Sequence, residues 1–483
     1  MPQYETSIEI PSFAGINQTR NGYNQSPSYA FEMENVNVEN GNFAPMREGL
    51  EIQQHLENPI GTLAYLHRRY AAENEPKTLL VAISDGKVYT KALDQDDEWQ
   101  VRYTGLTVDD CDWVTYEINR EGDTDEQGTP SPVDVLLFTN ATDGMFCLYG
   151  DNLTVEAVET PYKFGVLARY NERIWGAGIL SMPDSMVYSA PYNPFDWEAQ
   201  TEIPEDGAGE IMQPTWDGDR FIALRQHGSD LLAFKRNSVW QVYGTNPGEF
   251  VVRRQYGGGT VEENTVAVYG DMAYMLGGDG IVRYNGNGVY PFRQEAVKVL
   301  MQERVNQDAI HQAVGAMRGN VYCLALPING STFCNAVLEY NILEQSFALR
   351  TEISVDTFLA VDERLFYTSA QSPGKVFEMR DDIGRTLPCS WKSCYQDLGL
   401  KSSIKSAFTI YMMVAAETTI PLYIGMRTEK KLKQKIFNVK PGKITKLKLN
   451  SKGRFFRLEI QSYSAVPFKI LGGIKIDLEL DPD

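Results

Sequence analysis

The stretch Asp279-Gly280-Ile281-Val282-Arg283-Tyr284 decides the fold, because it joins a tight turn to a short strand and has counterparts further along the chain. Asp-Gly supplies the positive φ of a hairpin turn, and Ile, Val and Tyr favour strands. Gly319-Asn320 precedes Val321-Tyr322 in the same way, and Glu363-Arg364 precedes Leu365-Phe366-Tyr367. The steps between Asp279, Asn320 and Glu363 are 41 and 43 residues. Because four-stranded propeller blades repeat at ~40–50 residues, this spacing predicts a β-propeller.

Short strands fill the region from about residue 60 to residue 388. Leu79–Ile83 and Arg173–Ala177 are typical, being rich in β-branched or aromatic residues and bounded by turn residues. Asp-Gly turns recur at 85–86, 143–144, 217–218 and 279–280. We therefore expect an all-β, degenerate propeller of six or seven blades; a large sandwich with regular hairpins is the alternative. One helix is predicted over 294–305, with its apolar residues on one face: Val297, Leu300, Met301 and Val305.

Charge divides the chain into parts. The 483 residues carry a net charge of −19, yet residues 390–483 hold 17 Lys and Arg against 8 Asp and Glu, and residues 1–389 hold 28 against 56. A reversal of this size predicts a domain boundary near Pro388. We expect an N-terminal arm with closing strands (1–59), the propeller (60–388) and a basic β-sandwich (389–483). Alternation of the kind seen in Ile444–Leu449 indicates the sandwich strands.

Basic residues crowd into one span of that last domain. Eleven Lys and Arg lie between residues 430 and 457, with no acid among them. They can form an ordinary solvated face whose edge lysines prevent aggregation, or a face that docks on acidic protein or on a nucleic-acid backbone. The residues that we assign to protein docking as a hypothesis are Lys430, Lys431, Lys433, Lys435, Lys446, Lys448, Arg454 and Arg457.

The sequence offers no catalytic, cofactor-binding or metal motif. Six cysteines are too sparse for a disulfide scaffold, and the closest pair, Cys389 and Cys394, has no second ligand pair nearby for zinc. No phosphate-binding loop, H-E-x-x-H or G-x-S-x-G occurs, and carboxylates are too numerous to single out a catalytic pair. The first residues lack the basic and apolar segments of a secretory signal, and no apolar run reaches ~18 residues, so no membrane segment is expected.

Several stretches resemble bacteriophage virion proteins, whose N-terminal regions share the patterns F-x-G-I-N, A-x-N-V and R-x-G. The stretches that carry this likeness are Pro11–Thr19, Ser28–Val38, Gly41–Gly49, Asn171–Ala177, Val187–Ala190, Asn193–Trp197, Gly278–Ile281 and Gly453–Leu458. The family that the chain resembles is the tail hub, or nozzle, of short-tailed phages, also called the phage stabilisation protein. The likeness is spread thinly over most of the chain.

The resemblance implies a structural protein without enzymatic activity or cofactor. Six copies would form a tube below the portal and the head-to-tail adaptor protein, with tail fibre or spike and tail-tip proteins as further partners. The tube would retain phage DNA and conduct it during ejection, without sequence recognition. Its place would be the virion tail, assembled in the host cytoplasm. Acidic and neutral walls would suit such a conduit, because they do not hold the phosphate backbone.

Two other classes of function stay open. The first is a carbohydrate-binding or sugar-cleaving tail protein. Propeller sialidases, which cleave sugars, carry S-x-D-x-G-x-T-W boxes in their blades. Residues 84–89 and 142–146 echo these boxes loosely, with the wrong spacing. A cellular propeller scaffold is the second. Activity on a host surface glycan would favour the sugar-cleaving protein, and co-purification with phage particles would exclude the cellular scaffold.

Overall fold

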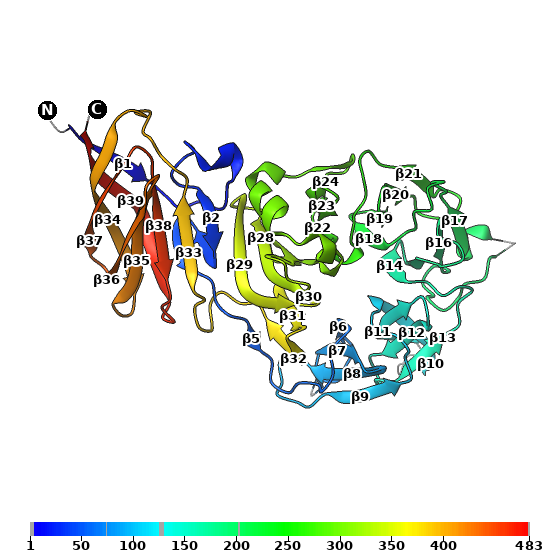
Figure 1. Cartoon of the computed structure of the whole chain (residues 1–483). Helices are drawn as coiled ribbons and strands as arrows, with labels where there is room; N and C mark the ends of the chain where they lie inside the picture. The colour runs from blue at the N-terminus through cyan, green and yellow to red at the C-terminus, as the bar shows by residue number, and fades with distance from the viewer. Residues whose placement is uncertain (1–3, 74, 125–129, 201–202, 482–483) are drawn as a thin grey trace.

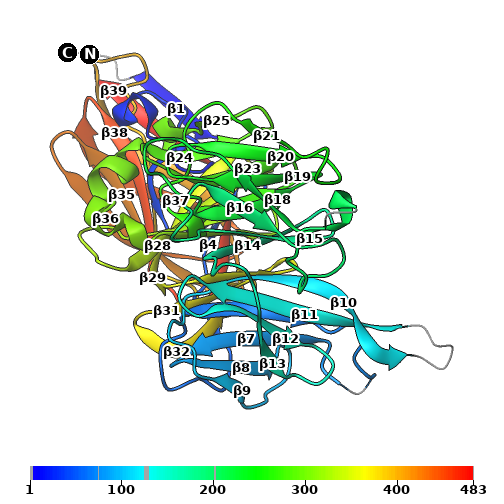
Figure 2. The same cartoon turned by 90° about the vertical axis from the view of Figure 1, so that its right-hand side faces the viewer.

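The computed structural model describes residues 4–73, 75–124, 130–200 and 203–481, and it has two lobes, a ring of small sheets and a β-sandwich (Figure 1). Within these described residues, seven four-stranded antiparallel sheets form the ring. The predicted all-β propeller is therefore confirmed, and it has seven blades. A long hairpin of blade 2 projects from the ring (Figure 2).

The first four blades each use four consecutive strands. Blade 1 consists of β6 (Thr62–His67), β7 (Thr78–Ser84), β8 (Lys87–Ala92) and β9 (Gln100–Thr104). Blade 2 consists of β10 (Asp112–Thr124), β11 (Pro130–Asn140), β12 (Gly144–Tyr149) and β13 (Val155–Val158). Blade 3 consists of β14 (Val166–Tyr170), β15 (Arg173–Ala177), β16 (Ser185–Tyr188) and β17 (Gly209–Met212). Blade 4 consists of β18 (Ala223–His227), β19 (Asp230–Phe234), β20 (Val239–Tyr243) and β21 (Val251–Arg254).

Blades 5 and 6 also use four consecutive strands each, whereas blade 7 joins two distant parts of the sequence. Blade 5 consists of β22 (Ala267–Tyr269), β23 (Met272–Gly277), β24 (Gly280–Tyr284) and β25 (Val289–Pro291). Blade 6 consists of β26 (Val314–Arg318), β27 (Val321–Leu326), β28 (Cys334–Asn341) and β29 (Ser346–Val355). Blade 7 consists of β30 (Phe358–Val361), β31 (Arg364–Ser369), β32 (Ser372–Glu378) and β5 (Leu50–Glu51). Because β5 precedes blade 1 and pairs with β32, it closes the ring.

Asp-Gly turns behave as their chemistry predicts. Asp85 and Gly86 have φ of 53° and 68°, so the hairpin between β7 and β8 has two central residues with positive φ. The glycines of the other three dipeptides also have positive φ: Gly144, Gly218 and Gly280. The turns at 85–86, 143–144 and 279–280 join β7 to β8, β11 to β12 and β23 to β24, and so they help to set the register within blades 1, 2 and 5, whereas 217–218 lies between blades 3 and 4.

The helix predicted over 294–305 is wrong as a single helix. The segment forms a 3-10 turn, η4 (Gln294–Ala296), and a π-helical turn, η5 (Leu300–Arg304). The side chain of Gln18 breaks the helical ladder, because Leu300 donates its backbone N–H to Gln18 Oε1 (3.0 Å). Gln18 in turn donates its backbone N–H to the carbonyl of Ala296 (2.9 Å). The predicted apolar face is nevertheless buried, from Val297 to Val305.

The other described helical turns are short 3-10 segments. They are η1 (Thr19–Gly22), η2 (Pro204–Asp206), η3 (Glu263–Thr265) and η6 (Gln307–Gln312). Among the described residues, no helix has the length and apolar character that crossing a lipid bilayer requires.

The sandwich is assembled from both ends of the sequence. Its six-stranded sheet contains β1 (Tyr4–Ile10), β3 (Val36–Glu39), β4 (Asn42–Pro45), β34 (Ile404–Ala416), β37 (Ile444–Gly453) and β39 (Phe468–Asp481). Its five-stranded sheet contains β2 (Ala30–Glu34), β33 (Cys389–Ser393), β35 (Ile420–Thr428), β36 (Leu432–Val439) and β38 (Phe456–Ser462). The segment expected to be an arm thus places β1 to β4 in the sandwich and β5 in the propeller.

This strand exchange changes the charge of each lobe. Residues 1–49 and 390–483 together hold 19 Lys and Arg against 14 Asp and Glu, whereas residues 50–389 hold 26 against 50. The sandwich is therefore less basic than its C-terminal part alone, but its sign still opposes that of the propeller.

One continuous core joins the lobes. Tyr274 and Leu338 of blades 5 and 6 belong to the same buried cluster as Leu300 of the helical turn and Trp391 and Phe408 of the sandwich. Burial of such side chains contributes roughly 1.5–3 kcal/mol each relative to exposure. Strands β2 and β3 of the sandwich pack directly against β29 of blade 6 (Figure 1).

A buried ion network reinforces this junction. Arg350 of β29 donates to Glu339 (2.6 Å) and to Asp381 (2.8 Å). Arg318 donates to the other oxygens of the same two carboxylates, at 2.7 Å each. Arg350 also donates to the carbonyl of Arg47 (2.6 Å). Because Arg47 precedes β5 and Asp381 follows β32, the network fixes both crossings of the chain between the lobes to blade 6.

Candidate functional site

The centre of the propeller contains a cavity of about 790 Å³, lined by the first strand of each of the seven blades in the described chain. A volume of this size falls within the ~300–1,000 Å³ of small-molecule sites. Tyr65 of β6 and Trp113 of β10 contribute aromatic rings to its wall, and Arg225 of β18 contributes a guanidinium. We call this cavity the central channel.

Five carboxyl groups line one end of the central channel. They stand at the start of a first strand or just before it, ahead of β10, β22 and β30: Asp110, Asp112, Glu262, Glu263 and Asp356. Every blade begins with its innermost strand, so the starts of these strands surround the same mouth. The fold therefore gathers acids that are up to 246 residues apart in the sequence.

Burial and mutual repulsion make these groups weaker acids than usual. Burial raises the pKa of Asp110, and the charges of Asp112 and Asp356 raise it further. Burial also raises the pKa of Asp112, although Arg225 Nη1 lies 3.7 Å from its Oδ2. The pKa values of Glu262, Glu263 and Asp356 are raised by burial as well. A carboxyl with a raised pKa can keep its proton nearer neutral pH and donate it, as a general acid does.

Nothing in the described part of the chain resembles a metal centre, because no three His, Cys, Asp or Glu residues lie in a metal-binding arrangement there. The sequence did not single out the channel carboxyls among 64 Asp and Glu. Their common signal is a place at the start of the first strand of a blade or in the few residues before it, and that place can be recognised only when the blade boundaries are known.

The docking residues predicted in the sandwich lie on two sheet edges rather than on one face. Six of them are exposed, and we call these six the basic edge: Lys430, Lys431, Lys433, Lys435, Lys446 and Lys448. Strands β36 and β37, at the ends of the two sheets, carry the last four, and Lys430 and Lys431 lie in the turn before β36. None of the six lysines of the basic edge forms an ion pair with a described residue.

The side chains of the basic edge point in different directions. Lys433 and Lys435 lie opposite the buried Met426 and Ile424, so they share the core side of the sheet and overhang its border. Inward-pointing charges of this kind discourage edge-to-edge pairing, as the solvated interpretation holds. Lys446 lies opposite Tyr411 on the outer side of the other sheet, with Nζ 5.4 Å from the ring centroid.

Arg454 and Arg457 differ from these six. Arg454 is exposed, and its backbone N–H donates to the carboxylate of Glu429 (2.8 Å). Arg457 corrects the expected docking set, because it is only 9% exposed and its Nε lies 2.9 Å from Glu459 Oε1. Its guanidinium also covers the ring of Tyr395, 5.1 Å from the centroid. Arg457 therefore shares the neutralisation of the buried Glu459 with Arg427.

Comparisons with known proteins find similar solved structures but no family model and no curated relative. Among solved structures, BamB from Moraxella catarrhalis is 9% identical with a TM-score of 0.39, over 71% of this chain and 95% of that chain. The Pan2 WD40 domain of Neurospora crassa is 11% identical with a TM-score of 0.38, over 68% and 91%.

An enzyme also appears among these similar structures. The exo-β-1,3-galactanase of Phanerochaete chrysosporium is 8% identical with a TM-score of 0.28, over 89% of this chain and 99% of that chain. BamB and the WD40 domain share the propeller architecture. Likeness at these values carries no argument about activity or partners.

Proposed function

We propose that this chain is a structural subunit of the tail of a short-tailed bacteriophage, where six copies form a ring below the portal and the head-to-tail adaptor. The sequence resemblance to tail hub proteins supports this role. The ring would retain DNA and conduct it during ejection, with fibre or spike and tail-tip proteins attached. Its conduit is the opening enclosed by the six copies, not the central channel of one propeller.

One structural observation carries the proposal: two rigidly joined lobes have opposite charge. A basic edge on one lobe and an acidic propeller on the other can make the same contact between every pair of neighbours, and a repeated heterologous contact closes into a ring when the rotation between neighbours allows it. The shared core and the Arg350 network hold the two lobes at a fixed angle, which such closure requires. The excess of acid in residues 50–389 also suits a surface along which DNA slides without binding.

Charge reversal of the basic edge tests this assembly. Replacing Lys430, Lys431, Lys433 and Lys435 with Glu should weaken ring formation, and the parent ring should weaken with salt as the Debye length falls below ~8 Å. The control reverses four exposed cations of the propeller and its neighbouring turns: Lys77, Lys163, Arg253 and Lys298. If phage particles with the quadruple basic-edge variant assemble and hold DNA as well as the parent does, the basic edge is only a solvated surface.

The central channel favours a second candidate, a protein that binds or cleaves a carbohydrate. Its carboxyls with raised pKa are the kind of group that protonates a leaving oxygen in glycoside hydrolysis. Asp112→Asn should then abolish release of reducing sugar from a host surface glycan and leave assembly intact. Absence of such release by the parent protein, over many glycans, would remove this candidate and leave the ring proposal untouched.

A further inference from the structure

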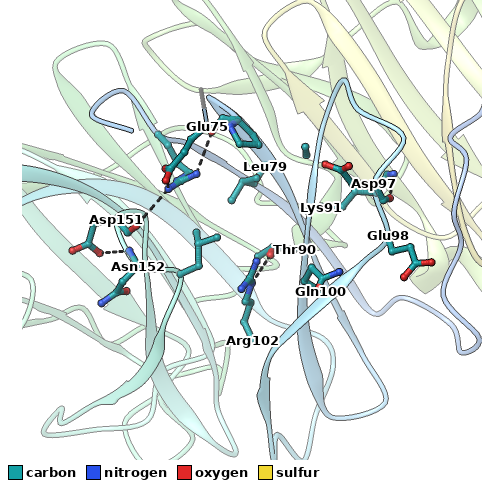
Figure 3. A pocket seen from close by; sticks show the side chains of 14 residues that line it. Glu75, Leu79, Thr90, Lys91, Asp97, Glu98, Gln100, Arg102, Asp151 and Asn152 are labelled. Carbon is teal, nitrogen blue, oxygen red and sulfur yellow. Dashed lines mark hydrogen bonds and ion pairs between the residues drawn. The ribbon is translucent and has the colours of Figure 1, made fainter. Parts of the chain in front are cut away.

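A second cavity lies at the periphery of the propeller, between blades 1 and 2, with a volume of about 620 Å³ (Figure 3). Strands β8 and β9 of blade 1 form one side, and residues 151–153, between β12 and β13 of blade 2, form another. We call it the blade 1–2 pocket. Within the described chain, it shares no lining residue with the central channel.

Two of the three cations around this pocket are satisfied by the protein itself. Arg68 is only 4% exposed and donates to Glu75 (2.6 Å) and to the carbonyl of Gly150 (2.5 Å). Lys91 is 2% exposed and donates to the carbonyls of Gln95 (3.1 Å) and Asp97. Because neutral carbonyls are its hydrogen-bond partners, the buried charge of Lys91 still contributes a positive potential to the pocket. Burial accordingly lowers the pKa of Lys91.

Arg102 is the cation whose hydrogen bonds the described part of the protein does not complete. Its Nε donates to Thr90 Oγ1 (2.8 Å), but no described residue accepts a hydrogen bond from its two terminal amino groups or forms an ion pair with it. Burial and the nearby charge of Arg68 lower the pKa of Arg102, as expected for a guanidinium without a counter-ion. A planar guanidinium with two free amino groups is suited to bidentate contact with a carboxylate or a phosphate.

The remaining polar groups of the pocket suit hydroxyls. Figure 3 shows Gln100 near Arg102, Asp97 and Glu98 on one side, and Asp151 and Asn152 on the other. The Oδ1 of Asn152 already accepts from Thr154 (2.9 Å), which leaves its amide nitrogen as a donor. Carboxylates at the rim would repel a second acidic group but accept hydrogen bonds from hydroxyls.

We propose that the blade 1–2 pocket binds a sugar-sized ligand that carries one anionic group, a carboxylate or a phosphate, and several hydroxyls. The anionic group pairs with the terminal amino groups of Arg102. The hydroxyls contact Gln100, Asn152 and the carboxylates of the rim. Binding can be measured on a single chain, because every residue that lines the pocket belongs to one chain and none belongs to the basic edge.

Saturation-transfer NMR with the full chain tests the pocket, using glucuronate, glucose 6-phosphate and neutral glucose as probes. We expect saturable binding of at least one anionic sugar in the millimolar range and none of glucose. The two anionic probes distinguish a carboxylate site from a phosphate site. Glucose signals that match those of both anions would contradict the role given to Arg102.

Substitutions assign the binding to Arg102. Arg102→Gln should weaken binding at least about tenfold, because it removes a charge-assisted bidentate contact. The matched control is Arg253→Gln. Arg253 is exposed and lies on the outermost strand of blade 4, and Arg102 lies on the corresponding strand of blade 1. Equal melting temperatures of the two variants would show that folding is intact. Binding that survives Arg102→Gln, or parent protein that binds neither anion, would overturn the proposal.

Discussion

Replacing Arg350 with Met tests whether the buried ion network holds the two lobes together. The side chain is only 1% exposed, and it contributes two ion pairs and the contact with the carbonyl of Arg47. Met fills a similar volume without charge, so among the described residues Glu339 and Asp381 keep only Arg318 as an ion-pair partner. Removing one partner of a buried ion pair typically costs about 3–5 kcal/mol, because a buried charge is left uncompensated.

That loss translates into a measurable change in melting temperature. An unfolding entropy of about 2.1 cal/mol/K per residue amounts to roughly 1 kcal/mol/K for 483 residues, so the midpoint should fall by about 3–5 °C. Differential scanning calorimetry of the parent and of Arg350→Met gives the comparison. Arg253→Met, at an exposed position of β21, is the control and should change the unfolding free energy by less than about 0.5 kcal/mol.

The effect of Arg350→Met should also depend on pH. Burial alone would raise the pKa of Asp381, but Arg350 and Arg318 outweigh it and hold this pKa below its usual value. A carboxylate with a lowered folded-state pKa stabilises the protein above its unfolded pKa of about 3.9, and this contribution is lost as pH falls through the folded value. The difference between parent and variant should therefore be full at pH 7 and shrink below about pH 4. Equal midpoints at pH 7 would refute the reasoning.

Two further predictions concern packing and thiol chemistry. A Cβ on Gly259 would lie 1.7 Å from the carbonyl oxygen of Lys235, whereas one on Gly258 would meet nothing within 4 Å. Denaturant titration should therefore show that Gly259→Ala lowers the free energy of unfolding by more than about 2 kcal/mol and that Gly258→Ala lowers it far less. All six cysteines are buried, and burial raises the pKa of four of them to about 12: Cys111, Cys323, Cys334 and Cys389. Iodoacetamide at pH 8 should therefore label the native thiols slowly, and faster once the chain is unfolded in urea. Rapid native labelling would show that the core opens.

Local chemistry was sufficient to predict the propeller. Asp85-Gly86 specifies its turn from two adjacent residues, and the 41- and 43-residue steps follow from repeated hairpins. The strand exchange of the sandwich could not be predicted in this way, because Tyr4 pairs with Leu480 at the other end of the chain. The break in the helix had the same kind of cause, since Gln18 lies 282 residues from Leu300.

The candidate sites were harder to predict than the fold. Alternation in β37 correctly placed Lys446 and Lys448 on an exposed side, because each strand residue follows a period of two. It could not show that Arg457 would be covered and paired with Glu459, since that depends on packing between β38 and its neighbours. Arg102 and the channel carboxyls likewise gain their character from residues of other blades or strands.

The mass of the purified protein in solution tests the central claim most directly. A ring of six copies predicts a dominant species with six times the 54.4 kDa of one chain at low salt, and a shift towards smaller species as salt is added. The measurement should be made with the chain alone and with its adaptor, by light scattering or mass photometry. A monomer under both conditions, at every salt concentration, would contradict the account.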